Sequence, residues 1–437
     1  MKYLYINPIR GNTSFFALFS SKLELESFDI LNNDDSRIQE FKEANYKILC
    51  FDTFKVMGAF KYEFFPCDDV QTLYQLQGYQ FRNLIDLGNQ TLGQNRMEKY
   101  ISISDKVNVH IDSYRVAKID VNQFGTNELI PRNLLEDLFK ERALIVTQLY
   151  KNIKNNDVKK FYNDRFIKVL KSLDGISRDP IKINLDTARA SKSHHLKAIL
   201  EKVKHEHLYL TYNPVGAKTG RLSFNKNSPN IYGIPKKLRS CIVPEDGFKI
   251  AQFDFKAFQP RLAIFSTDNK QFKKKFKDID DIYSVFPGDR QENKIAFLAW
   301  MYSPYPKNDV FENEAGPILT LRRKLYKKSR KNSVLVNTFG RPIYYTWEPQ
   351  HTVFQNYITS LEVDVILSIM TTLHTVLRKK RSRIMFPFHD ALFFEIHEKE
   401  MDLLRVFQNY MESFLQKTFD ARFPVEVKIG NNLGELK

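Results

Sequence analysis

The sequence predicts an α+β protein of several domains, and three observations carry this prediction. The chain has 437 residues, enough for two or three domains, and 43% of them are apolar, which is typical of a globular protein. Residues 248–255 and 384–396 have the apolar, β-prone composition of strands, and a tight turn divides the second segment. Residues 141–204 repeat apolar side chains every three to four positions, a spacing typical of helices.

Charge and cysteine content narrow the class of protein. Lys and Arg number 67 against 51 Asp and Glu, and a net charge of +16 favours a polyanionic partner such as nucleic acid. Charge alone leaves a merely basic enzyme as an equal alternative. Cys50, Cys67 and Cys241 are too few and too scattered for a disulfide framework or a four-ligand zinc site. No charge-free run approaches the ~20 apolar residues of a membrane span, so we expect a soluble, cytoplasmic protein with no membrane partner.

One acidic residue stands at the end of the first strand segment. Asp254 follows Ile250 and Phe253 and precedes Phe255. A carboxylate among such side chains is costly to bury unless a cation or a hydrogen-bond donor meets it. Asp254 is therefore a candidate metal ligand.

The segments around Asp254 resemble the palm region of family A DNA polymerases, the bacterial polymerase I type, in a compact phage-type form. The resemblance rests on TGRLS at 219–223, PNI at 229–231, Ile234-Pro235, and Arg261 seven residues after Asp254. It implies a right-hand fold of palm, fingers and reduced thumb behind an amino-terminal exonuclease-like domain. The implied domains are an exonuclease-like domain at 1–140, the thumb at 141–206, palm at 207–266, fingers at 267–355 and palm again at 356–437.

The amino-terminal segment is expected to keep an RNase H-like α/β fold without proofreading activity. Strands are predicted at Tyr3–Ile6 and Ser14–Phe19, and residues 68–93 resemble part of the 3′–5′ exonuclease domain of this family. That chemistry needs clustered carboxylates for two divalent ions. No acid occurs between Met1 and Leu23, and Arg142 stands in an acidic position of a predicted helix. An unrelated accessory domain is the alternative.

The catalytic pair is predicted to be Asp254 and Asp390. His389 and Asp390 form the tip of the predicted hairpin at 384–396, and folding this hairpin beside the strand of Asp254 brings two acids together. The resemblance implies two Mg²⁺ ions, replaceable by Mn²⁺, held by both aspartates and the backbone of Phe255 for phosphoryl transfer. For an isolated His-Asp pair, an ordinary Asx-type turn is the alternative.

A second group of residues is predicted to bind the nucleotide. Arg290, Lys294, Leu298 and Tyr302 are each four apart, which places them along one line of a helix. Arg290 and Lys294 suit the phosphates, and the other two face the base and sugar. Arg-x3-Lys-x7-Tyr is the fingers-helix pattern of the family, although two cations at this spacing are commonly just solvated. The resemblance adds Gln259 and His389 to this set.

The sequence also departs from the family at several positions. DNA polymerases usually carry Glu where this chain has Gln259, and that Glu excludes the ribose 2′-hydroxyl and contacts the fingers Tyr. Gln keeps the volume but loses the charge. We expect weaker discrimination against ribonucleotides than in a Gln259→Glu variant. Ala391 replaces a common second acid of the hairpin, and Thr359 replaces a Gln that aligns the primer-template.

Basic and polar side chains outside this set are assigned to DNA. In the family, the residue matching Arg221 reaches the minor-groove side of the primer terminus. Residues 321–331 hold seven cations in eleven positions, although a charge run is most often a solvated helix face. The predicted DNA-binding residues are Thr219, Arg221, Arg261, Arg322, Arg323, Lys324, Lys327 and Lys328.

Taken together, the sequence predicts a DNA-templated DNA polymerase that extends a primer 3′-hydroxyl with dNTPs and does not proofread. Its expected partners are primer-template DNA and dNTPs, with a helicase, primase or processivity factor, in a bacterial host cytoplasm if the chain is phage-encoded. A single-subunit phage-type RNA polymerase-like or ribonucleotide-tolerant enzyme is one alternative. A catalytically inactive nucleic-acid-binding protein is the other.

Overall fold

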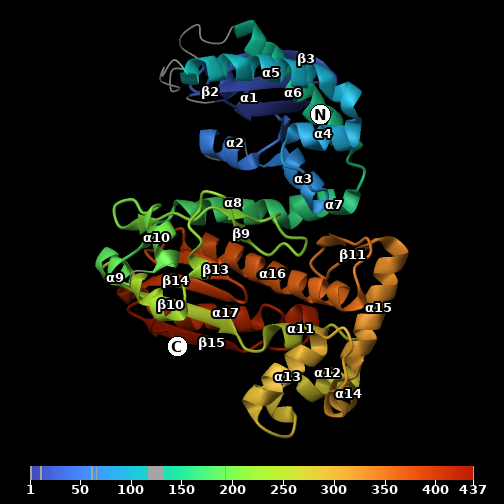
Figure 1. The fold of residues 1–437 in the computed structure, drawn as a ribbon, viewed down its shortest axis with the longest axis vertical. Coiled ribbons are helices and arrows are strands. Elements are labelled where there is room, and N and C mark those ends of the chain that lie inside the picture. Colours follow the sequence, from blue (N-terminus) through green and yellow to red (C-terminus); the bar gives the residue numbers. More distant parts are fainter. Residues whose placement is uncertain are drawn as a thin grey trace. The chain divides into compact units, whose positions relative to one another are not determined.

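Two sheets organise this chain, one in each of the units into which it divides, Met1–Tyr162 and Asn163–Lys437 (Figure 1). The computed structural model describes residues 2–9, 12–60, 63–64, 66–116, 132–191 and 193–436. Residues 117–131 of the predicted exonuclease-like domain therefore lie outside the described part. The division falls inside the segment assigned to a reduced thumb, and the five-part domain scheme stays a prediction.

The first unit alternates short strands and helices, followed by two long helices. Its elements are β1 Tyr3–Pro8, β2 Thr13–Phe19, β3 Leu25–Asn32, α1 Ser36–Glu43, β4 Lys47–Cys50, α2 Thr53–Phe60, β5 Cys67–Asp69, α3 Val70–Leu76, α4 Leu84–Leu92, α5 Gln94–Val116, α6 Arg132–Asn152 and α7 Asn156–Phe161. A π-helical turn at Tyr162–Phe166 leads into the second unit.

The sheet of the first unit has the order β3-β2-β1-β4-β5. β1, β2 and β3 are antiparallel neighbours, whereas β4 and β5 run parallel to β1. The two predicted strands at the amino terminus are confirmed as β1 and β2. β1 is central in the sheet, and its Leu4, Tyr5 and Ile6 are all buried. Because successive side chains of a strand point to opposite faces, both faces of β1 are covered. α5 and α6 pack against each other, and α6 also packs on β2 and β3.

The second unit is larger and contains most of the predicted site. Its helices are α8 Ile167–Arg178, α9 Leu185–Ala190, α10 His194–Leu200, α11 Phe258–Phe265, α12 Lys270–Phe276, α13 Arg290–Tyr302, α14 Asp309–Ala315, α15 Pro317–Asn332, α16 Gln350–Leu377, α17 Leu403–Ser413 and α18 Gln416–Phe419. Short 3₁₀ helices lie at Ile231–Gly233, Lys236–Cys241, Ile282–Val285 and Glu398–Glu400. Its strands are β6 Ile181–Lys182, β7 His207–Leu208, β8 Tyr212–Asn213, β9 Ser223–Phe224, β10 Phe248–Phe255, β11 Val334–Val336, β12 Pro342–Tyr344, β13 Arg383–Phe388, β14 Ala391–His397 and β15 Val425–Gly430.

A four-stranded antiparallel sheet, in the order β13-β14-β10-β15, forms the core of this unit. The predicted strand at 248–255 and the predicted hairpin are confirmed as β10 and as β13–β14. Phe253 of β10 stacks edge-on against Phe394 of β14, and both side chains are fully buried. α16 packs against β13 and β14, and α17 packs against β15.

Alternation along β10 explains why its acid is not lost in the core. Phe253 and Phe255 are buried, whereas Gln252 and Asp254 point to the other face, as the two-residue period of a strand requires. Gln252 Nε2 donates to Asp254 Oδ2 at 3.1 Å, so the two polar side chains satisfy each other in part. The strand therefore buries its apolar residues while it presents a carboxylate.

α16 is the long helix behind this sheet. By length and composition it is apolar enough to cross a membrane, but 67% of its most apolar window is buried inside the protein. The core helix of a globular protein passes the same test. Two acids, Glu362 and Asp364, interrupt it, and both are buried. Asp364 receives hydrogen bonds at 2.6 to 3.0 Å from the guanidinium of Arg341, which is the pairing that makes a buried charge tolerable.

Candidate active site

Asp254 and Asp390 lie at the same end of two adjacent strands. In the β10–β14 register Asp254 pairs with Ala391, the residue after Asp390, and the Phe255 amide donates to the Asp390 carbonyl at 3.4 Å. His389 and Asp390 form the two-residue turn of the hairpin, with His389 at φ 54°, a left-handed conformation in which His is enriched. Both aspartates line one cavity of about 560 Å³ together with Phe255.

The electrostatics of this cavity favour a bound cation. Burial, together with the nearby charges of Asp254 and Glu362, raises the pKa of Asp390 to about 7. Burial also raises the pKa of Asp254, helped by Glu426 across the β10–β15 pairing, while Lys428 and Lys294 oppose the shift. Carboxylates whose pKa is raised by each other are stabilised in their ionised form when a cation lies between them.

The donor set fits hard divalent ions. Mg²⁺ takes oxygen ligands and is commonly bound by one or two carboxylates that are completed by substrate phosphates and water. Asp254 and Asp390 supply carboxylates, and the backbone of Phe255 lies beside them in the same cavity. Among the described residues, no group of three or more His, Cys, Asp or Glu side chains is arranged to hold a metal ion without such help.

The predicted nucleotide stripe faces the same cavity. Arg290, Lys294 and Leu298 of α13 line it with the two aspartates. Asp289 starts this helix by accepting hydrogen bonds from the amides of residues 291 and 292 at 2.8 and 2.9 Å, which fixes the first turn that carries Arg290. Arg290 is held in turn by an ion pair with Asp281, which lies just before a short 3₁₀ helix.

Four side chains next to this stripe form a connected network. Tyr302 donates its hydroxyl to Gln259 Oε1 at 2.6 Å, and Gln259 Nε2 donates to Glu362 Oε2 at 2.6 Å. Arg221 donates to the other oxygen of Glu362 at 2.9 Å. Glu362 is only 2% exposed, so α11, α13, α16 and the loop of Arg221 meet at one buried carboxylate. The amide hydrogens of Gln259 therefore face Glu362, and its carbonyl oxygen faces Tyr302.

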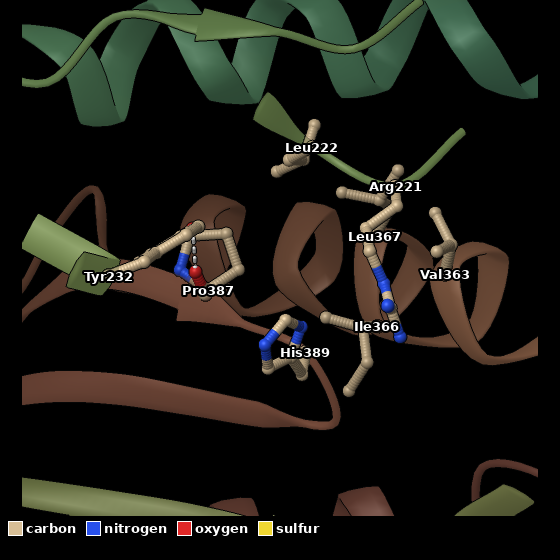
Figure 2. Close-up of a pocket in the computed structure, with 8 residues that line it drawn as sticks. All are labelled: Arg221, Leu222, Tyr232, Val363, Ile366, Leu367, Pro387 and His389. Carbon is tan, nitrogen blue, oxygen red and sulfur yellow. Dashed lines mark hydrogen bonds between the residues drawn. The ribbon is translucent and has the colours of Figure 1, made fainter. Parts of the chain in front are cut away.

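Arg221 reaches this network along α16. Figure 2 shows its side chain passing Val363 and Ile366, with His389 lining the same small pocket of about 30 Å³. Gly220 stands just before it at φ +80°, and a Cβ there would lie 2.4 Å from the guanidinium of Arg341. Glycine is thus required at this position both by its backbone conformation and by the close approach of a buried arginine.

The fold containing this site is similar to the polymerase domain of Pol1 from M. smegmatis, whose structure is a complex with DNA primer-template and dNTP. The TM-score is 0.74 at 13% sequence identity, over 100% of this chain and 96% of that chain. This chain shares the fold of a polymerase domain. A scan against protein-family models found no match.

The predicted likeness to polymerases is thus confirmed for the polymerase fold as a whole. The compact phage-type form, the separate palm, fingers and thumb, and the absence of proofreading stay predictions. The site roles of individual residues also stay predictions, although the structure brings most of them to one place. The residues that line or bond to the site cavity are Arg221, Asp254, Phe255, Gln259, Arg290, Lys294, Leu298, Tyr302, His389 and Asp390.

Two residues assigned to DNA are corrected by their burial. Arg261 is 0% exposed, and its guanidinium donates to the carbonyls of Lys256, Ile279 and Asp280. Arg322 is 2% exposed and donates to the Pro304 carbonyl at 3.4 Å. A guanidinium inside the protein cannot meet a phosphate, so both are structural in this polymerase fold. The other four cations assigned on α15 are exposed; they are Arg323, Lys324, Lys327 and Lys328. Thr219 is half-buried in the loop before Arg221.

Sequence reasoning missed three acids of the site. Glu362 holds Gln259 and Arg221, Asp281 pairs with Arg290, and Glu426 faces Asp254 across β10 and β15. A signal for Glu362 existed, because an acid inside a long apolar helix needs a partner. Glu426 enters the site through the strand register and Asp281 through the fold of a loop, and no local sequence pattern reports either.

Proposed function

We propose that this chain is a DNA-templated DNA polymerase that adds dNTPs to a primer 3′-hydroxyl. The observation that carries the proposal is one cavity lined by two carboxylates and two cations. The carboxylates are Asp254 on β10 and Asp390 in the adjacent hairpin turn, and the cations are Arg290 and Lys294 of α13. Phosphoryl transfer needs negative ligands for divalent ions and positive groups for a polyphosphate within reach of each other. The likeness to a polymerase domain seen with primer-template and dNTP supports the same reading.

The two aspartates and the Phe255 carbonyl would hold two Mg²⁺ ions, or Mn²⁺ in their place. When bound, these ions supply activation of the 3′-hydroxyl and neutralisation of the charge that develops on the triphosphate. The protein contributes a rigid cradle, because Asp254 lies on β10 and Asp390 lies in the tight turn between β13 and β14, two hydrogen-bonded strands of the same sheet. The turn at His389 fixes the direction in which Asp390 leaves the hairpin.

The α13 stripe would bind the incoming nucleotide. Lys294 is exposed to the cavity, and its charge opposes the rise in the pKa of Asp254, so this cation is close to the proposed metal site. Arg290 is occupied by Asp281 in the free protein, so a triphosphate would exchange one anionic partner for another. Leu298 lines the cavity one turn further on. Tyr302, one more turn along, is joined to the cavity residue Gln259 by its hydroxyl and would face the base and sugar.

Binding of DNA would use Arg221 at the primer terminus and the exposed cations of α15 on backbone phosphates. Arg221 is anchored by Glu362, so its remaining donors have a fixed direction. The α15 cations supply charge that is independent of sequence, as backbone contacts do. Salt should therefore weaken DNA binding steeply.

We also propose that the amino-terminal unit lacks nuclease activity. Its central strand β1 carries Tyr5 and Asn7 where a nuclease of this resemblance needs its first acids. Arg142 of α6 donates to Asn7 Oδ1 at 3.0 Å and to the Tyr100 hydroxyl at 3.1 Å, so a cation occupies this position. A buried guanidinium repels divalent ions, which supports a scaffold role for this unit.

Extension of a labelled primer on a defined template tests the proposed function. We expect addition of only the dNTP complementary to the next template base, with Mg²⁺ present, and no shortening of the primer in the absence of dNTPs. Preferential use of rNTPs, or synthesis without a primer, would instead favour the RNA polymerase-like alternative. Binding of primer-template without any addition would favour an inactive nucleic-acid-binding protein and would overturn the proposal.

A further inference from the structure

The two tryptophans of the chain have opposite environments. Trp300 of α13 is 4% exposed and packs on Phe297 and Phe311, as a core aromatic does. Trp347 is 81% exposed. Tryptophan is highly buried on average, so a ring left in water needs an explanation other than packing.

The backbone around Trp347 is held on both sides. The β11–β12 hairpin returns the chain to the end of α15, where the Tyr345 amide donates to the Ser333 carbonyl at 2.9 Å. The Thr346 amide donates to Glu348 Oε2 at 2.7 Å, and Glu348 is ion-paired with Lys218. The ring is therefore exposed on an ordered turn.

One face of the ring is already covered by a cation. The guanidinium carbon of Arg330 lies 4.2 Å from the centroid of Trp347, within cation–π range. Arg330 also donates to the Thr346 carbonyl at 3.1 Å, which fixes the guanidinium against the turn. The pair presents a flat π surface backed by positive charge, and Trp347 as a whole residue remains 81% exposed.

A line of exposed cations leads along α15 to this ring. Arg323, Lys327 and Arg330 follow at intervals of four and three residues, so they share one face of the helix over about 10 Å. Within the described residues, none of the three is ion-paired with an acid, whereas Lys324 beside them is bonded to Asp268. Unpaired cations in a row are complementary to a polyanionic backbone.

We propose that Trp347 and Arg330 form a stacking platform for an unpaired base of a single nucleic acid strand, whose phosphates lie along Arg323 and Lys327. Aromatic rings backed by arginine stack bases of any sequence, and a basic groove tracks the backbone between them. Single strands offer exposed base faces, whereas duplexes do not. On the proposed function, which this step assumes, the strand is the template that has not yet been paired.

Intrinsic fluorescence of the full-length chain tests the platform without any catalysis. Titration with oligodeoxythymidylate should quench the emission of Trp347 to saturation, because stacking on a base quenches an exposed indole. A strand of abasic sites and a blunt duplex should bind, as measured by the anisotropy of a labelled strand, without this quenching. Trp347→Ala should weaken single-strand binding about 5- to 100-fold, whereas Trp347→Phe retains a ring and should lose much less affinity. Lys379→Ala is the matched control, because it removes an exposed cation just past the carboxyl end of α16, whereas Trp347 lies just before the amino end of that helix.

Saturated binding with unchanged emission would overturn the platform, and so would equal quenching by the abasic strand. The outcome is separable from the proposed polymerase activity. Asp254→Asn should quench like the wild-type protein, because that aspartate is not part of the platform. Quenching without primer extension would remove only the proposed function, and primer extension without quenching would remove only the platform.

Discussion

Replacing Asp390 by Asn is expected to reduce nucleotide addition by at least about 1,000-fold, because several kcal/mol of charge stabilisation depend on its carboxylate. Asp254→Asn should do the same. The free energy of unfolding, in contrast, should not fall. The pKa of Asp390 is raised by burial and by Asp254, so at pH above its ordinary value the ionised group costs folding free energy. In metal-free buffer at pH 8, we expect Asp390→Asn to keep or increase the free energy of unfolding, by on the order of 1 kcal/mol.

Single-turnover incorporation and urea unfolding of the same preparations measure both effects. Asp246→Asn is the matched control, because Asp246 is a fully exposed acid near the other end of β10, where it is ion-paired with Lys182. It should change neither quantity appreciably. Activity of Asp390→Asn within tenfold of the wild type, or its loss together with unfolding, would contradict the assignment.

Exchanging the amide and the acid at positions 259 and 362 is expected to show strong coupling. Gln259→Glu alone places a second carboxylate where a 2.6 Å hydrogen bond joins Gln259 to Glu362, so it should lower kcat/KM for dNTPs about 10- to 100-fold. The same variant tests the prediction from sequence that Gln259→Glu discriminates better against rNTPs than the wild type does. Glu362→Gln alone removes the charge and one of the two oxygens that accept from Gln259 and Arg221, and it should relax discrimination against rNTPs.

The double exchange, Gln259→Glu with Glu362→Gln, restores one acid and one amide with their positions reversed. We expect it to recover most of the dNTP activity and to discriminate against rNTPs better than Glu362→Gln does. Steady-state kinetics of the four proteins with dNTP and rNTP give a coupling energy, expected at about 1 to 3 kcal/mol. Additive effects, within about 0.5 kcal/mol, would mean that Glu362 does not act through Gln259.

The elements that the sequence predicts correctly are those that short stretches of the chain determine. The strand of Asp254, the hairpin tip at Asp390 and the helix of Arg290 are set by short-range periodicity, and the structure has all three. Their convergence on one cavity depends on long-range strand pairing. Short-range periodicity does not report this pairing, and the family resemblance supplied the expectation instead. Glu426 enters the site only through the β10–β15 register.

The assignment of Arg261 and Arg322 to DNA was wrong because it rested on their charge and not on their burial. Arg322 and Arg323 are neighbours in one basic run, yet the helical rotation between them puts the first inside the protein and leaves the second in solvent. Arg261 is a second example, because its guanidinium is buried and donates hydrogen bonds to the carbonyls of Ile279 and Asp280 in a loop. A periodicity reading of 321–331, in which Leu321, Leu325 and Ser329 mark the buried face, would have separated the two classes.

The central claim is that Asp254 and Asp390 together hold divalent ions facing the α13 stripe. Anomalous scattering from a crystal of the protein with Mn²⁺, primer-template and a non-hydrolysable dNTP tests it most directly. The account predicts anomalous peaks between the two carboxylates, with the triphosphate against Arg290 and Lys294. Manganese bound elsewhere, or a triphosphate away from α13 while both aspartates stay without metal, would contradict it.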